Sequence, residues 1–252
     1  MFRRILLLLL VMMVAPRGHA QDGTLRIAAA ADLQPVLPSL IDRFEKQTQK
    51  KVEASYASSA TLATQIMNGG PFGLFLSADV SFPQKVIAAG LADSSEPVAY
   101  ARGTLVLWAR NDSPAQPLSL DTLRSGSLKT VAVANPEHAP YGRAAKAAIE
   151  KLGLTESLQG KLVVAENIAQ TAQYADSGNA QAGLISLTSA LTPRLSADGK
   201  YVVMPEDSYP PLLQGAVVIK GSPASGEAHR FLDFLMSSAV RKELAERGLK
   251  AP

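Results

Sequence analysis

Two adjacent hydroxyl side chains, Ser58 and Ser59, stand in the stretch YASSATLATQI, where an alternating strand pattern gives way to an amphipathic helix. A helix N-terminus leaves about four backbone N–H groups without partners and carries the positive end of the helix dipole. Such a place can bind an anion, and the stretch contains no Lys or Arg that would indicate ion pairing. Serine is also a common helix cap, so this stretch alone leaves both interpretations open.

Similar junctions, where an apolar run meets the start of a helical pattern, recur along the chain. The residues at these junctions are Ala31-Asp32, Ser77, Tyr141, Asn167-Ile168 and Ser186. If two lobes face each other, their helix N-termini and hydroxyls can surround a compact anion without any cationic side chain. Each hydrogen bond to a charged ligand contributes about 1.5–3 kcal/mol, so some six donors can offset the desolvation of a small oxyanion.

The elements that must position these residues alternate between apolar runs and helical periodicity. Repeated strand-helix-strand units predict parallel sheets covered by helices, and ligands of such folds bind beyond the carboxyl ends of the strands. The expected strands are 25–31, 51–57, 74–79, 104–110, 130–136, 161–166, 182–187, 201–205 and 215–220.

The grouping of these units predicts an α/β fold with two lobes. We expect residues 21–100 and 211–252 to form lobe 1 and residues 101–210 to form lobe 2, with two hinge crossings between them. Each lobe is expected to contain a mostly parallel sheet with helices on both faces. The first expected helix contains Pro38, which would either kink it or make it start late, near Leu37.

The N-terminal stretch MFRRILLLLLVMMVAPRGHA has a basic start, an apolar run and a small-x-small cleavage site. It predicts a signal peptide over 1–20, cleaved after Ala20, and therefore a periplasmic protein. The chain has 25 Lys and Arg against 22 Asp and Glu, and the leader removes three arginines, so the mature protein is neutral. Neutrality gives no support to nucleic-acid binding.

Several segments together resemble one family, the periplasmic molybdate-binding proteins of ABC importers. They are LRIAAAADL, YASSATLATQI, GPFGLFLSADVSFPQKVIAAGL, TLVLWAR and ANPEHAPYGRAA. The resemblance implies a two-lobed protein, expected to be a monomer without a cofactor, that closes on molybdate or tungstate and delivers it to a membrane permease. It implies no enzymatic activity.

The resemblance also implies ligand contacts, residue by residue. The first-strand site falls on Ala31-Asp32, and the next hydroxyl is Ser59 with Ser58 beside it. A second-lobe ligand position falls on Tyr141, and a backbone donor on Ile168. Ser186 stands where part of the family carries a tyrosine. The bound species is expected to be the molybdate or tungstate oxyanion at Asp32, Ser59, Tyr141 and Ile168, rather than a bare metal ion.

Asp32 departs from the family pattern, because a carboxylate beside a dianion is unfavourable at low effective dielectric. Three explanations stay open. Asp32 turns away and caps its helix while its backbone N–H serves the ligand; or it accepts a hydrogen bond from a protonated, phosphate-like oxyanion; or the pocket takes another ligand, such as an organic carboxylate.

A hydrolase is a further alternative, with Ser59 and His138 as its candidate pair. It would need a nucleophile elbow of the G-x-S-x-G kind, which ASSAT lacks. Asp79 is expected to cap the helix that begins near Phe82 rather than to bind a metal.

Overall fold

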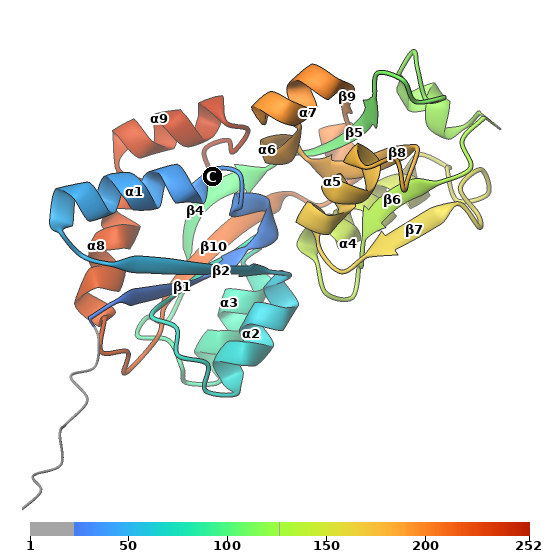
Figure 1. Cartoon of the computed structure of the whole chain (residues 1–252). Helices are drawn as coiled ribbons and strands as arrows, with labels where there is room; N and C mark the ends of the chain where they lie inside the picture. Colours follow the sequence, from blue (N-terminus) through green and yellow to red (C-terminus); the bar gives the residue numbers. More distant parts are fainter. Residues whose placement is uncertain (1–22, 126) are drawn as a thin grey trace, which may run out of the picture.

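The computed structural model describes residues 23–125 and 127–252, so the predicted signal peptide lies outside the described residues. The chain forms two five-stranded sheets that lie side by side, with orders β2-β1-β3-β10-β4 and β7-β6-β8-β5-β9 (Figure 1). None of the helices in the described residues is long and apolar enough to cross a bilayer.

The elements of the two lobes are defined by these bounds. Around the first sheet lie β1 (Leu25–Ala30), η1 (Ala31–Leu33), α1 (Leu37–Thr48), β2 (Val52–Ala57), α2 (Ser59–Met67), β3 (Leu74–Ser77), α3 (Ser81–Ala88), β4 (Val98–Gly103), β10 (Leu212–Val218), α8 (Ser225–Met236) and α9 (Ser238–Glu246). Around the second lie β5 (Leu105–Arg110), η2 (Leu120–Leu123), β6 (Val131–Ala134), α4 (Pro140–Lys151), β7 (Leu162–Ala165), α5 (Ile168–Asp176), β8 (Ala182–Ser186), α6 (Leu187–Ala190), α7 (Pro193–Asp198), β9 (Gly199–Val203) and η3 (Glu206–Ser208).

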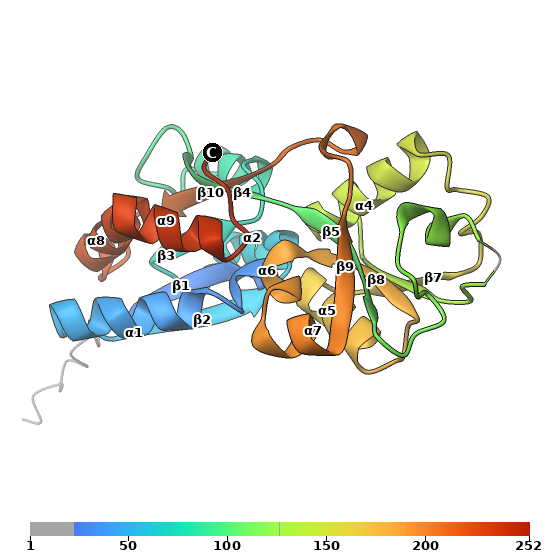
Figure 2. The ribbon, with the colours of Figure 1, turned by 90° about the horizontal axis from the view of Figure 1, so that it is seen from above.

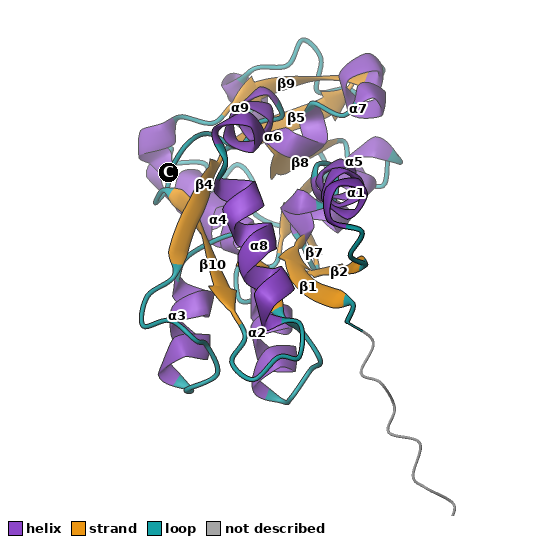
Figure 3. Cartoon of the chain, turned by 90° about the vertical axis from the view of Figure 1, so that its left-hand side faces the viewer, coloured by secondary structure: helices purple, strands orange, loops and turns teal. Residues whose placement is uncertain are grey.

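The first sheet is buried on both faces, because successive side chains of a strand point to opposite sides. Leu74 and Leu76 of β3 pack with α1, α8 and α9, whereas Phe75 between them packs with α2 and α3. On the first of these faces Phe44 and Phe231 meet edge to face, with their ring centroids 5.0 Å apart. Figure 3 shows α8 in front of the strands β4 and β10.

The second sheet repeats this arrangement. Leu105 and Leu107 of β5 pack with α4, and Val106 and Trp108 pack on the other face with α5 and α6. The core below α4 continues into the first lobe through the small side chains of Ala30, Ala31 and Ala78. Small residues at this boundary let the two lobes approach closely.

Two details differ from or refine the expectations. Helix α1 begins at Leu37, so Pro38 occupies the first turn, where its missing N–H leaves no intrahelical bond unmade. The late start is therefore confirmed, and no kink is needed. Residues 98–103, which are not among the expected strands, form β4 and pair antiparallel with β10.

The chain passes between the sheets twice, as the view from above shows (Figure 2). It leaves the first sheet after β4, enters the second at β5, and returns through the segment between β9 and β10. Both passages lie beside the carboxyl ends of the parallel strands, which is where the predicted site residues are found.

Candidate functional site

The N-terminus of α2 carries the adjacent serines Ser58 and Ser59. Ser58 is the helix cap: its Oγ accepts from the backbone N–H of Thr61 at 3.3 Å. The Oγ of Ser59 accepts from the backbone N–H of Ala78 at 3.1 Å and is buried between the ends of β2 and β3. That bond uses an oxygen lone pair, so the Ser59 hydroxyl keeps its proton for an acceptor.

Asp32 lies in the 3-10 turn directly after β1 and is fully buried. Its Oδ2 accepts from the hydroxyl of Tyr141 at 3.3 Å and from the side-chain amide of Gln214. Tyr141 comes from α4 of the second lobe, and Gln214 from β10. The carboxylate caps neither η1 nor α1, so the structure does not support the first of the three explanations for this residue.

Burial dominates the electrostatics of this group. It raises the pKa of Asp32 from 3.8 to about 6, although the hydrogen bonds from Gln214 and Tyr141 act in the opposite direction. The pKa of the Tyr141 hydroxyl is raised well above its usual value, first by burial and then by the charge of Asp32. Tyr141 therefore stays a proton donor at all physiological pH values.

A chain of hydroxyls connects the second lobe to the backbone of Asp32. The Oγ1 of Thr188 lies 2.7 Å from the Asp32 carbonyl oxygen and 2.9 Å from the Oγ of Ser186. Because a carbonyl can only accept, Thr188 donates to it and must accept from Ser186. Ser186 in turn accepts from the backbone N–H of Ser189 at 3.3 Å. This arrangement gives Ser186 a part in joining the lobes, and its contact with a ligand stays a prediction.

Gly103 makes room for Tyr141 at the point where the chain leaves the first sheet. A Cβ atom at Gly103 would overlap the Tyr141 hydroxyl oxygen, at a separation that real Cβ atoms do not show. Glycine is therefore required here if the tyrosine is to reach Asp32.

The remaining predicted contacts lie at helix starts near the same junction. Ala31 is buried in the turn after β1, and Ile168 is the first residue of α5. The Asn167 side chain caps that helix by accepting from the N–H groups of Ala169 and Gln170 at 3.0 Å each. These bonds do not involve the N–H of Ile168, which is the donor predicted for an anion. Helices α5 and α6 both pack against η1, so the second-lobe residues come close to Asp32.

A second set of contacts joins the lobes at the solvent-exposed rim. Arg143 of α4 pairs with Asp79, and its guanidinium lies 5.2 Å from the centre of the Phe82 ring. The N–H of Ala60 donates to the carbonyl of His138 at 3.1 Å. Asp79 also accepts from the N–H of Phe82 at 3.2 Å, which confirms its predicted capping role.

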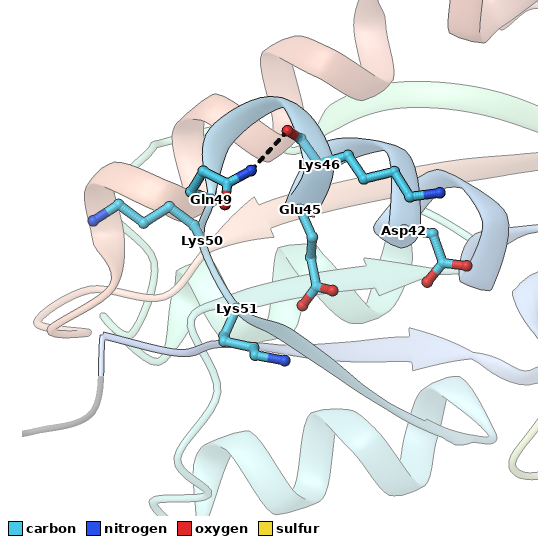
Figure 4. Close-up of a pocket in the computed structure, with 6 residues that line it drawn as sticks. All are labelled: Asp42, Glu45, Lys46, Gln49, Lys50 and Lys51. Atoms are coloured by element: carbon cyan, nitrogen blue, oxygen red, sulfur yellow. Dashed lines mark hydrogen bonds between the residues drawn. The ribbon is translucent and has the colours of Figure 1, made fainter.

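Charged hollows also occur on the surface, some of them away from this junction. One is lined by residues at the turn between α1 and β2, at the opposite end of β2 from the serines (Figure 4). Its wall is made by Asp42, Glu45, Lys46, Gln49, Lys50 and Lys51. The residues that line this hollow are mostly charged and exposed. The hollow therefore lacks the buried, uncharged donors that are found at the junction.

Sequence reasoning missed two residues of the junction, Gln214 and Thr188. Gln214 is fully buried within the strand LLQGAVV, where it is the one polar side chain. A lone amide inside an apolar strand was therefore the available signal. Thr188 had no comparable signal, because its partner is a backbone carbonyl from the other lobe.

Comparison with known proteins places this geometry in a family. A model of the family "Bacterial extracellular solute-binding protein" matches residues 25–250. The chain belongs to this family. A protein of Azotobacter vinelandii named molybdate-binding protein ModA is 34% identical over 220 residues, which cover 86% of this chain and 85% of that protein. A ModA of Rhodobacter capsulatus is 35% identical over 229 residues, covering 91% and 89%.

The fold of this solute-binding protein agrees with that of a solved relative. The periplasmic molybdate-binding protein of A. vinelandii superposes with a TM-score of 0.82 at 29% identity, covering 90% of this chain and 99% of that one. The predicted α/β architecture, a type II periplasmic binding protein fold with a sheet in each of two lobes, is thereby confirmed. The predicted resemblance to molybdate-binding proteins is confirmed as well.

Proposed function

We propose that this solute-binding protein captures molybdate or tungstate between its lobes and delivers the oxyanion to the permease of an ABC importer. The observation that supports this proposal is that uncharged donors from both lobes meet at one buried junction. The chain is also similar to proteins named ModA. In this role it acts as a periplasmic monomer without a cofactor, and it binds its ligand without transforming it.

We place the two lobes by the sheets to which their strands belong. Because β4 pairs with β10 through Gly103, the first lobe extends to that residue, slightly beyond the expected 100, and resumes near Pro211. The second lobe then starts at Thr104. Closing motion would turn about these two passages.

The proposed cage consists of the Ser59 hydroxyl and the backbone N–H groups of Ala31, Asp32 and Ile168. The hydrogen-bonded side chains of Asp32 and Tyr141 form one side of it. Rigid dipoles at fixed spacing favour an anion of matching radius, whereas long cationic side chains adapt to many anions. Ser58 supports this cage as the cap of α2.

A phosphate-like anion is the second candidate, and Asp32 is the observation that favours it. The Oδ1 atom of Asp32 is buried without a hydrogen-bond partner. Such an atom can accept a hydrogen bond from a protonated oxyanion, as phosphate is near neutral pH.

Calorimetric titration of the mature protein tests the proposal. The protein is first unfolded and dialysed to remove bound anions, then refolded and titrated with molybdate, tungstate, sulfate and phosphate. We expect one tight site for molybdate and tungstate. Tighter binding of phosphate would favour the second candidate, and no heat with any oxyanion would contradict both.

A further inference from the structure

The proposed site contains a buried acid that no cation neutralises. Asp32 is fully buried, and none of the ion pairs among the described residues includes it. Its partners are the uncharged Tyr141 and Gln214. A dianion bound beside an ionised Asp32 would place like charges together in a region of low dielectric, which is strongly unfavourable.

The two carboxylate oxygens of Asp32 differ in their surroundings. Oδ2 accepts from both the Tyr141 hydroxyl and the Gln214 amide, so its lone pairs are occupied. Oδ1 is buried and has no partner, and the same holds for the Oε1 of Gln214. Buried polar atoms without partners are rare in folded proteins and call for a specific explanation. A proton on Oδ1 would turn that atom into a donor while leaving both bonds to Oδ2 intact.

The other titratable groups around Asp32 do not supply a counter-charge. Tyr141 on α4 and Tyr100 on β4 both have a raised pKa, so they stay neutral. Three elements pack against η1, namely β2, α5 and α6. On β2, Glu53 pairs with Arg26, and burial raises the pKa of Tyr56 to about 12. On α5, Asp176 pairs with Arg194, and α6 has no titratable side chain.

We propose that the oxyanion binds together with one proton from solvent, and that this proton lies between Asp32 Oδ1 and an oxygen atom of the anion. The inference rests on the proposed function and makes Asp32 a ligand contact that works only when a proton is present. The bound ion and the side chain then carry two negative charges between them instead of three, and no bond other than the shared hydrogen bond is formed.

Linkage gives the consequence that can be measured. The pKa of Asp32 without a bound anion is about 6, so above pH 7 the free protein is ionised at this residue. Each binding event must then take up close to one proton, and the apparent affinity must fall about tenfold for each pH unit above 7. Below pH 6 the uptake declines, because the proton is already present.

The experiment is a titration of the intact mature protein with sodium molybdate at pH 7.5 in several buffers of different ionisation enthalpy. The slope of the observed heat against buffer enthalpy counts the protons taken up. We expect a slope near one for the natural protein and near zero for Asp32→Asn. A second variant, Asp32→Ser, gives the same readout should Asp32→Asn fail to fold.

Asp42→Asn is the matched control, because Asp42 is an exposed aspartate on α1 of the same lobe (Figure 4). It should keep the slope of the natural protein. Molybdate binding without proton uptake, or with equal uptake in both Asp32 variants, would overturn this inference and leave the proposed function standing. Absence of binding by any oxyanion at any pH from 5.5 to 8.5 would instead overturn the proposed function itself.

Discussion

The two lobes meet through contacts of two kinds, a buried set around Asp32 and an exposed set around Arg143. In the buried set an acid receives only neutral donors, and every side chain is nearly inaccessible. At the rim an acid, Asp79, has a guanidinium partner, and the Arg143 side chain is 42% exposed. The same type of residue, an aspartate, therefore has a raised pKa in one place and a charged partner in the other.

This difference shows how location decides what a carboxylate contributes. Buried away from cations, Asp32 destabilises the folded protein when it ionises, yet it offers a proton-dependent contact. At the surface, solvent and salt weaken the attraction between Asp79 and Arg143, so that pair fixes orientation more than it adds free energy.

The largest expected effect comes from Asp32→Asn in the absence of ligand. The folded state binds a proton at Asp32 more tightly than the unfolded state, so the free energy of unfolding must fall as pH rises from about 4 to 6 and stay level above. The shift from 3.8 to about 6 corresponds to about 3 kcal/mol. The amide introduced by the substitution does not titrate, so the variant lacks this loss and should be more stable than the natural protein at pH 7.5.

Urea denaturation at a series of pH values checks this, because the difference between the two proteins isolates residue 32 from all other titrating groups. Parallel pH profiles for the natural protein and the variant would show that Asp32 is not buried as an acid.

A smaller effect is expected for the buried hydroxyl of Ser59. Ser59→Ala removes one donor to a charged ligand and should weaken molybdate binding by about 1.5–3 kcal/mol, measured by calorimetry. Ser94→Ala is the control, since Ser94 is an exposed serine of the same lobe that bonds a local carbonyl. Unchanged affinity in Ser59→Ala would place the anion elsewhere.

The smallest effect is expected at the rim. Arg143→Gln should weaken molybdate binding by less than about 1 kcal/mol, and high salt should reduce even this difference because exposed ion pairs are screened. Titrations at low and high ionic strength measure it. A loss as large as that of Ser59→Ala, independent of salt, would mean that the rim and the buried junction contribute alike.

Sequence reasoning predicted most strands and the position of the serines, because apolar runs and helix starts are local signals. It also left open a late start for α1, which follows from the backbone of Pro38 alone. It missed β4, because VAYARG runs into TLVLWAR with only Thr104 between the two strands. Whether a strand belongs to one sheet or another depends on its partner, and the partner β10 lies more than a hundred residues further along the chain.

Local sequence patterns could not predict the neighbours of Asp32 for the same reason. Tyr141 and Gln214 donate to its carboxylate and Thr188 donates to its backbone carbonyl. These residues come from α4, β10 and α6 and are separated from Asp32 by 109, 182 and 156 residues. Only the folded chain brings such residues together. The sequence could mark Asp32 as unusual, but it could not name the groups that decide its protonation.

The order of strands in the two sheets also sets the order in which the lobes can be completed. The second sheet is built from one continuous stretch, β5 to β9, and can assemble as soon as that stretch is available. The first sheet cannot, because β10 must fit between β3 and β4, and α8 and α9 must cover one face. The first sheet therefore keeps an open edge at β3 until the last segment of the chain has folded onto it.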